Sequence, residues 1–152
     1  MAEEMSLYRR RRRARSVIFH CCRIGVGIVF AWSSIPKIFD ATSFISRLQD
    51  YAILPATITP LVASAVPWLE FIVALCILCN LMVADALLVC VVLFGLYAVA
   101  QIHAIGRGLK IECGCGVAHS GEVIGFFTIA RTSGLLLLAA LAFRLAKQRE
   151  AL

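Results

Sequence analysis

The sequence predicts an all-α integral membrane protein, a four-transmembrane-helix bundle with a short interfacial helix in the first outer loop. Of its 152 residues, 61% are hydrophobic and 16% charged, which lies outside the composition of soluble domains. Crossing about 30 Å of hydrocarbon takes about 20 apolar residues in a helix, and four windows are long enough. These windows are Val17–Phe39, Leu61–Met82, Ala84–Ile105 and Val123–Phe143. We therefore expect one membrane domain, residues 17–143, between terminal tails 1–16 and 144–152.

The first window follows a basic run, Arg9–Arg13 and Arg15, so a secretory signal is the alternative to a retained helix. The apolar stretch is longer than a typical signal core and leads into Ser33-Ser-Ile-Pro-Lys37, without the usual small-residue cleavage site. We therefore expect a retained helix.

The distribution of lysine and arginine predicts the orientation, because cytoplasmic loops of membrane proteins are enriched in both. The two tails share one face of an even-numbered bundle and carry six arginines at the N-terminus and Arg144, Lys147 and Arg149 at the C-terminus. The opposite face carries only Arg47, Arg107 and Lys110. Both termini of this multi-pass protein are thus predicted to be cytoplasmic, in the inner membrane. We interpret the arginine run as a determinant of topology that contacts anionic lipid. A nucleic-acid-binding patch is the less favoured alternative.

The first outer loop, Asp40–Pro60, has a helical pattern. Phe44, Leu48 and Tyr51 fall on one side, while Arg47 and Asp50 fall on the other. This pattern predicts a short helix on the membrane surface.

The seven cysteines divide by depth. Five lie in the cytoplasmic halves of predicted helices and are typical apolar packing residues: Cys21, Cys22, Cys76, Cys79 and Cys90. Cys76 and Cys79 have the spacing of a redox pair and form a possible relay, although they lie far from a helix N-terminus, where thiolates are stabilised. Cys113 and Cys115 stand alone in the outer loop Gly106–Gly121, on a side that is oxidising in bacteria.

Cys113 and Cys115 are separated by one glycine, so a disulfide between them closes a small, strained and reducible ring. Three hypotheses follow. The pair is a redox-active dithiol with catalytic function, a structural staple, or, with His119, a set of soft ligands for copper or zinc.

Charged residues within the predicted helices form a second candidate site, because such charges are expensive in hydrocarbon. Glu70 and Arg131 lie at similar depth and can pair, and Lys37 can extend outward or turn towards Glu70. One hypothesis is an ion pair that fixes helix packing. The other is a polar pocket, with contributions from Tyr97, Gln101 and His103, that receives a quinone head group or a partner's side chain. Arg23, near the cytoplasmic end, is expected to extend to the interface.

Several segments, in order, resemble the methylamine utilisation protein MauE family within the DoxX-like membrane proteins. They are Phe30–Lys37, Leu54-Pro55, Pro67–Glu70, Cys113–Gly116 and Ile124–Arg131. The resemblance runs from about Arg23 to Leu141. The sequence departs from the family at Gly116-Val117, where an aromatic residue is often found, and at Phe126-Phe127, where tryptophans are frequent.

The resemblance implies a four-helix inner-membrane protein associated with redox maturation. MauE is linked to producing the disulfide-rich small subunit of methylamine dehydrogenase, together with a thioredoxin-like partner. By this resemblance Cys113 and Cys115 are the motif cysteines, and Lys37, Glu70 and Arg131 occupy the family's intramembrane charged positions.

Together, these observations predict a membrane protein that exchanges thiols and disulfides with a thioredoxin-like or cysteine-rich extracytoplasmic protein. Electrons would pass to a quinone near Glu70 or through Cys76 and Cys79. The alternatives are a noncatalytic assembly or chaperone subunit that docks through small residues such as Gly25 and Gly27, and a metal-handling or transport protein. Whether the chain is itself an enzyme stays open.

Overall fold

The computed structural model of the protein describes residues 2–109, 111 and 125–150. Five helices make up this part of the chain: α1 (Ala2–Phe39), α2 (Ala41–Asp50), α3 (Thr59–Leu78), α4 (Val83–Gly106) and α5 (Phe126–Glu150). Four of them are long and apolar enough to span a membrane, with the candidate span in α1 running over Arg13–Phe39. The predicted all-α, four-span architecture is confirmed. Cys113, Cys115 and His119 lie outside the described residues.

The helix ends differ from the predicted windows most at α1, α3 and α5, the last of which runs to Glu150 through the predicted C-terminal tail. Helix α1 begins at Ala2 and runs through the arginines of the predicted tail before entering its span. Helix α3 ends at Leu78, before the predicted Met82, because Asn80 and Met82 adopt positive φ values of 62° and 43°. Left-handed backbone of this kind is costly for residues other than glycine and interrupts a right-handed helix. The turn between α3 and α4 is therefore tight.

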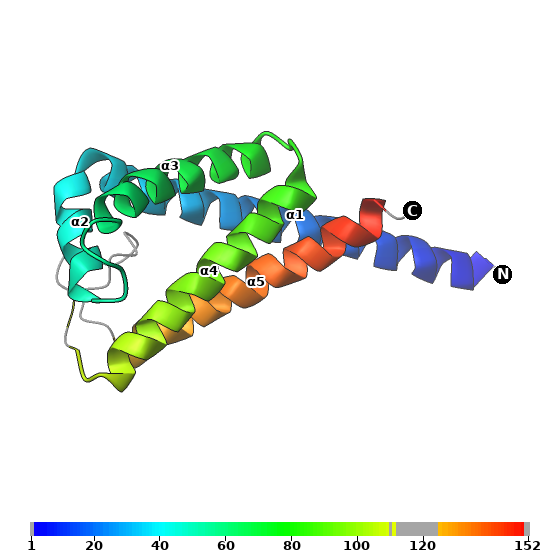
Figure 1. Ribbon diagram of the computed structural model, residues 1–152. Coiled ribbons are helices and arrows are strands. Elements are labelled where there is room, and N and C mark those ends of the chain that lie inside the picture. Colours follow the sequence, from blue (N-terminus) through cyan, green and yellow to red (C-terminus); the bar gives the residue numbers. More distant parts are fainter. Residues whose placement is uncertain (1, 110, 112–124, 151–152) are drawn as a thin grey trace.

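The four long helices pack as a ring. Helix α1 contacts α3 and α5, and α4 contacts the same two helices, so the bundle core lies between all four. Figure 1 shows the pairs α1/α3 and α4/α5 close together near the two termini and farther apart towards α2. Both chain ends thus lie at one end of the bundle, with α2 at the other.

The close approach of α1 and α3 depends on Gly27. A Cβ atom at this position would lie 2.9 Å from Leu78 Cδ2 and 3.2 Å from Ile77 Cγ2, whereas one at Gly25 would meet nothing within 4 Å. Small residues allow such close packing between membrane helices. Gly27 is therefore covered by α3 within the chain, and of the two glycines in the docking hypothesis only Gly25 has an open Cβ position.

The sequence predicted that Arg23 extends to the membrane interface, but its side chain turns into the protein instead. Its side chain is buried, and Nη1 donates a hydrogen bond to Oδ1 of Asn80 in the α3–α4 turn. The turn supplies a buried acceptor that linear sequence does not reveal, so the guanidinium binds the protein instead of lipid headgroups. Nearby, Arg149 of α5 donates to Ser16 Oγ at 2.6 Å and lies over the Phe19 ring, joining the last helix to the first.

Helix α2 confirms the short helix predicted in the first outer loop. Its apolar side packs against α3 and α1, with Phe44 and the adjoining Tyr51 buried and Asp50 exposed. Tyr51 also packs against Ala104 of α4, and its carbonyl oxygen accepts a hydrogen bond from Arg107 Nη1 at 3.4 Å. Both ends of α2 are thus attached to the bundle.

Asp40 caps the N-terminus of α2, and its carboxylate should titrate below the ordinary range. Hydrogen bonds from the Ser43 side chain, the Ser43 backbone N–H and the Thr42 hydroxyl stabilise the charged form and lower the pKa from 3.8. The cap is therefore complete above the ordinary pKa and is lost as pH falls through the lowered folded-state value. A carboxyl ¹³C NMR titration should give a midpoint below 3.8. In Ser43→Ala the midpoint should move upward, and an unchanged midpoint would contradict this assignment.

Candidate functional site

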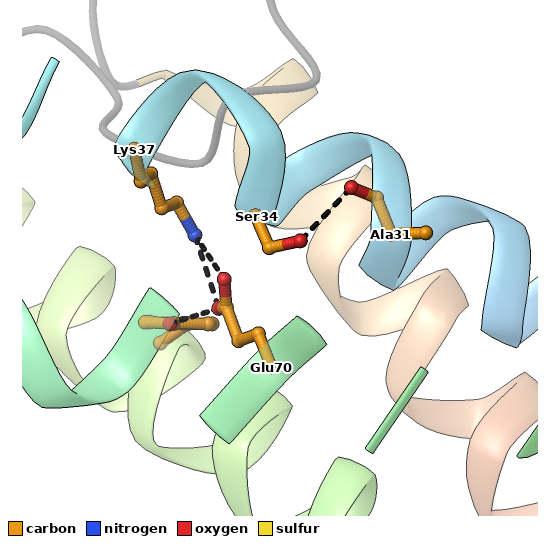
Figure 2. A network of polar contacts seen from close by, with 5 residues as sticks. Ala31, Ser34, Lys37 and Glu70 are labelled. Atoms are coloured by element: carbon orange, nitrogen blue, oxygen red, sulfur yellow. Dashed lines mark hydrogen bonds and ion pairs between the residues drawn. The ribbon is translucent and has the colours of Figure 1, made fainter. Parts of the chain in front are cut away.

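A buried ion pair between α1 and α3 lies at the α2 end of the bundle. Lys37 is in the last turn of α1 and Glu70 is on the inner face of α3. The Lys37 Nζ donates to both Glu70 carboxylate oxygens, at 3.0 Å and 2.8 Å, and the two side chains are only 4% and 2% exposed. Figure 2 shows them pointing towards each other from neighbouring helices. From sequence alone, either Arg131 or Lys37 could form an ion pair with Glu70. The structure shows the ion pair with Lys37.

Aromatic side chains surround the ammonium group of Lys37. Its Nζ lies 5.2 Å from the centroid of the Tyr97 ring and 5.5 Å from that of Phe44. The Tyr97 hydroxyl also donates a hydrogen bond to Glu70 Oε1. Tyr97 therefore joins α4 to the charged pair, and Phe44 brings α2 over it. Cation–π contacts of this kind gain strength when the cation is desolvated.

A small cavity of about 20 Å³ borders Glu70 in the interior of the bundle. Residues from α1, α3, α4 and α5 line it: the polar Ser33, Glu70, Tyr97 and Thr132, and the apolar Val29, Phe30 and Phe94. The Phe30 and Phe94 rings meet edge to face across the bundle, with centroids 4.8 Å apart. A cavity of this size has room for about one water molecule.

The cavity beside Glu70 does not fit the quinone head group suggested by the sequence. Sites for organic ligands generally occupy about 300–1,000 Å³, far more than the 20 Å³ found here. Gln101, one turn beyond Tyr97, is buried, and Arg131 is half-buried beside the cavity-lining Thr132. His103 is exposed and does not join this interior group.

The five cysteines within the described residues are free thiols. Cys76 is half-buried near the end of α3, and Cys79 caps that helix with an exposed side chain. At about 1.5 Å per residue, Cys76 lies roughly 25 Å along α3 from Thr59 at the α2 end. Cys90 is buried in the apolar core. Within the described ranges, no group of three acidic, histidine or cysteine side chains could hold a metal ion.

Sequence reasoning missed three contributors to the polar interior. Ser33 and Thr132 line the cavity, and Phe44 covers the Lys37 ammonium. Small hydroxyl residues are common in membrane helices, so Ser33 and Thr132 gave no distinct signal. Phe44 was placed correctly on the apolar side of the predicted surface helix. Only the folded structure shows that this side chain covers Lys37 of α1.

Comparison with known proteins gives a clear family match. The model of the family described as methylamine utilisation protein MauE matches residues 15–145. A protein from Methylophilus methylotrophus named methylamine utilization protein MauE is 32% identical over 112 residues. That alignment covers 72% of this chain and 59% of the relative, so the chain spans little more than half of that protein's length. No solved structure matches.

The matched residues 15–145 include all four candidate spans almost completely, together with Lys37, Glu70, Tyr97 and the Cys113–Cys115 motif. The family match therefore covers the membrane domain as a whole and not one isolated motif. The chain belongs to the MauE family of methylamine utilisation proteins.

Proposed function

We propose that this protein takes part in thiol–disulfide exchange during maturation of an extracytoplasmic protein, with methylamine utilisation as its setting. Cys113 and Cys115 form the redox pair in this proposal. Membership of the MauE family supports the setting, because the family and the relative both carry that name. The partner is a thioredoxin-like or cysteine-rich protein outside the cytoplasm.

The observation that carries the proposal is where the described cysteines lie relative to the ends of α4 and α5. Helix α4 ends at Gly106 and α5 begins at Phe126, both at the α2 end (Figure 1). The segment joining them contains Cys113 and Cys115. Of the other five, Cys21 and Cys22 lie in the first half of the span Arg13–Phe39, Cys76 and Cys79 at the end of α3, and Cys90 in the first half of α4. In this proposal Cys113 and Cys115 act apart from the five cysteines of the helices.

The orientation belongs to the same proposal. Arginines precede the span of α1, and further basic residues end α5, at the bundle end that holds both termini. Because basic residues are retained in the cytoplasm, this end faces inward in a bacterial inner membrane. The α2 end then faces the extracytoplasmic space, where disulfides persist.

The exchange proceeds through a mixed disulfide. A client thiolate attacks one sulfur of the Cys113–Cys115 disulfide, and the other cysteine leaves as a thiolate. A second client thiolate then attacks the mixed disulfide, so the client gains a disulfide and the pair leaves as a dithiol. Two electrons pass from client to pair, and a thioredoxin-like disulfide takes them back by the same steps. If the pair starts as a dithiol, the same steps in reverse reduce a partner's disulfide to two thiols and oxidise the pair.

Membrane-impermeant maleimide labelling of spheroplasts tests the proposal. Wild-type protein should label at Cys113 and Cys115 from outside only after reduction, and the single variants Cys113→Ser or Cys115→Ser should accumulate a mixed disulfide with a partner. The double serine variant should abolish maturation of the client. Cys21→Ser, which removes an exposed thiol in the first half of the α1 span, is the matched control and should keep full activity.

Two results would reject the proposal. Full maturation activity in the double serine variant would exclude the redox role, and labelling of the pair from the cytoplasmic side would overturn the orientation. Metal bound by wild-type protein and lost in the double variant would instead support the metal-handling hypothesis.

A further inference from the structure

We propose that helix α2 is a lid with two positions, one closed over the Lys37–Glu70 ion pair and one open, with its apolar side on the surface of the bilayer. The structure shows the closed position. The open position presents the Lys37 ammonium and the Glu70 carboxylate to the solution at the α2 end of the bundle. This device is independent of the thiol chemistry proposed above. Three observations support it.

The first observation is how little of α2 is buried. The structure describes this helix in full, and Phe44 is its one buried side chain. The centroid of the Phe44 ring lies 5.5 Å from Lys37 Nζ. The polar side of the helix, which includes Thr42, Ser43 and Gln49, is exposed. Helix α2 therefore covers the ammonium group through a single aromatic ring, and moving the helix separates little apolar surface from the bundle.

The second observation is the backbone on both sides of α2. Asp40, between α1 and α2, leaves the helical region with a ψ of 68°. Ala52, just after α2, has a φ of 47°, a left-handed conformation that is unfavourable for residues other than glycine. The chain then runs through turns until α3 begins at Thr59. Helix α2 is thus a rigid element between two nonhelical joints, and opening can relieve the strain at Ala52.

The third observation is that the apolar side of α2 has two places where it can be buried. The helix lies between the end of one candidate span at Phe39 and the start of the next at Thr59, which is the level of the membrane surface (Figure 1). Amphipathic helices bind there with their apolar side at the boundary of headgroups and acyl chains. Phe44 and Leu48 leave water in either position, which keeps the free-energy difference between the two positions small.

Arg107 holds the far end of the lid in the closed position. Its Nη1 donates a hydrogen bond to the carbonyl oxygen of Tyr51, directly after α2, and Tyr51 packs against Ala104 of α4. The Arg107 side chain is itself exposed, so its replacement disturbs no core packing. Loss of this hydrogen bond should therefore shift α2 towards the open position.

Acylation of Lys37 by a membrane-impermeant amine reagent measures the opening, because Nζ is covered in the closed position. The full chain is used in lipid nanodiscs, with peptide mass spectrometry as the readout. We expect Lys37 to react in the wild type, more slowly than the exposed Lys147. Arg107→Gln should raise the Lys37 rate several-fold. Arg144→Gln is the matched control, an exposed arginine of α5 near the termini, and should leave the rate unchanged.

A change at the joint after α2 should act in the opposite direction. Glycine adopts a φ of 47° without strain, so Ala52→Gly should stabilise the closed position and lower the Lys37 acylation rate several-fold. Ala56→Gly is the control, because Ala56 is exposed in the same segment but lies outside the left-handed region. A loss of stability alone would raise the rate in both Arg107→Gln and Ala52→Gly.

A bilayer-soluble carbene probe shows where the apolar side of α2 goes. Labelling of Phe44 should rise in Arg107→Gln together with Lys37 acylation. Cys90, buried in the apolar core, should stay protected from thiol reagents throughout, because α2 alone moves. Three results would overturn the proposal: Lys37 acylation that Arg107→Gln leaves unchanged, faster acylation without labelling of Phe44, or alkylation of Cys90 at the rate of Lys37 acylation, which would show unfolding of the whole bundle.

Discussion

Replacing Glu70 by methionine is expected to destabilise the bundle by about 3–5 kcal/mol, because the change leaves the Lys37 ammonium buried without its carboxylate. Lys37→Met should have an effect of similar size for the converse reason. The double variant Lys37→Met/Glu70→Met should recover most of the lost stability, since methionines of similar length fill the space without any buried charge. Equilibrium unfolding by SDS in mixed micelles, followed by the loss of helical circular dichroism, measures each step.

The double-mutant cycle makes this prediction specific to the pair. If the two single losses simply add in the double variant, Lys37 and Glu70 do not act together and the prediction is wrong. Tyr97→Phe is a useful companion because it removes only the hydroxyl that donates to Glu70. It should cost about 1.5–3 kcal/mol, the range for hydrogen bonds to charged groups.

Gly27→Val is expected to destabilise the bundle by about 1–3 kcal/mol, the usual range for overpacking. The added atoms meet Leu78 and Ile77 at distances below ordinary contact, so α1 and α3 must separate or both side chains must change rotamer. Separation of these helices would also strain the Lys37–Glu70 pair, which lies between the same two helices nearer the α2 end. The loss should therefore appear in the same unfolding assay.

Gly25→Val is the matched control for this experiment. It makes the same chemical change two residues away in the same helix, where a Cβ atom meets nothing within 4 Å. Both variants lose the same backbone freedom and gain the same β-branched side chain, so the difference between them isolates helix packing. Equal unfolding midpoints for the two variants would contradict the close approach at Gly27.

The ion pair and its neighbours join several helices near the α2 end. Lys37 connects α1 to α3, the Tyr97 hydroxyl adds α4, and the Phe44 ring adds α2. These contacts give that end of the bundle a defined geometry.

The four spans could be predicted from sequence because each must be apolar over about 20 residues, a local property. The common end of the two termini follows from the even number of spans. The short helix α2 could also be predicted, from the helical spacing of Phe44, Leu48 and Tyr51. For α3, the left-handed residues Asn80 and Met82 moved the end of the helix from the predicted position. Apolar composition alone gives no such boundary.

By itself, the sequence determined the membrane architecture and identified the candidate charges, and it predicts that Cys113 and Cys115 lie apart from the other thiols. Only the tertiary structure decided which partners those side chains meet. Glu70 has Lys37 as ion-pair partner, Arg23 turns to Asn80, and the cavity beside Glu70 is too small for a quinone. The physical reason is that depth along a helix follows from residue number, whereas the direction a side chain takes around the helix matters only once its neighbours are packed.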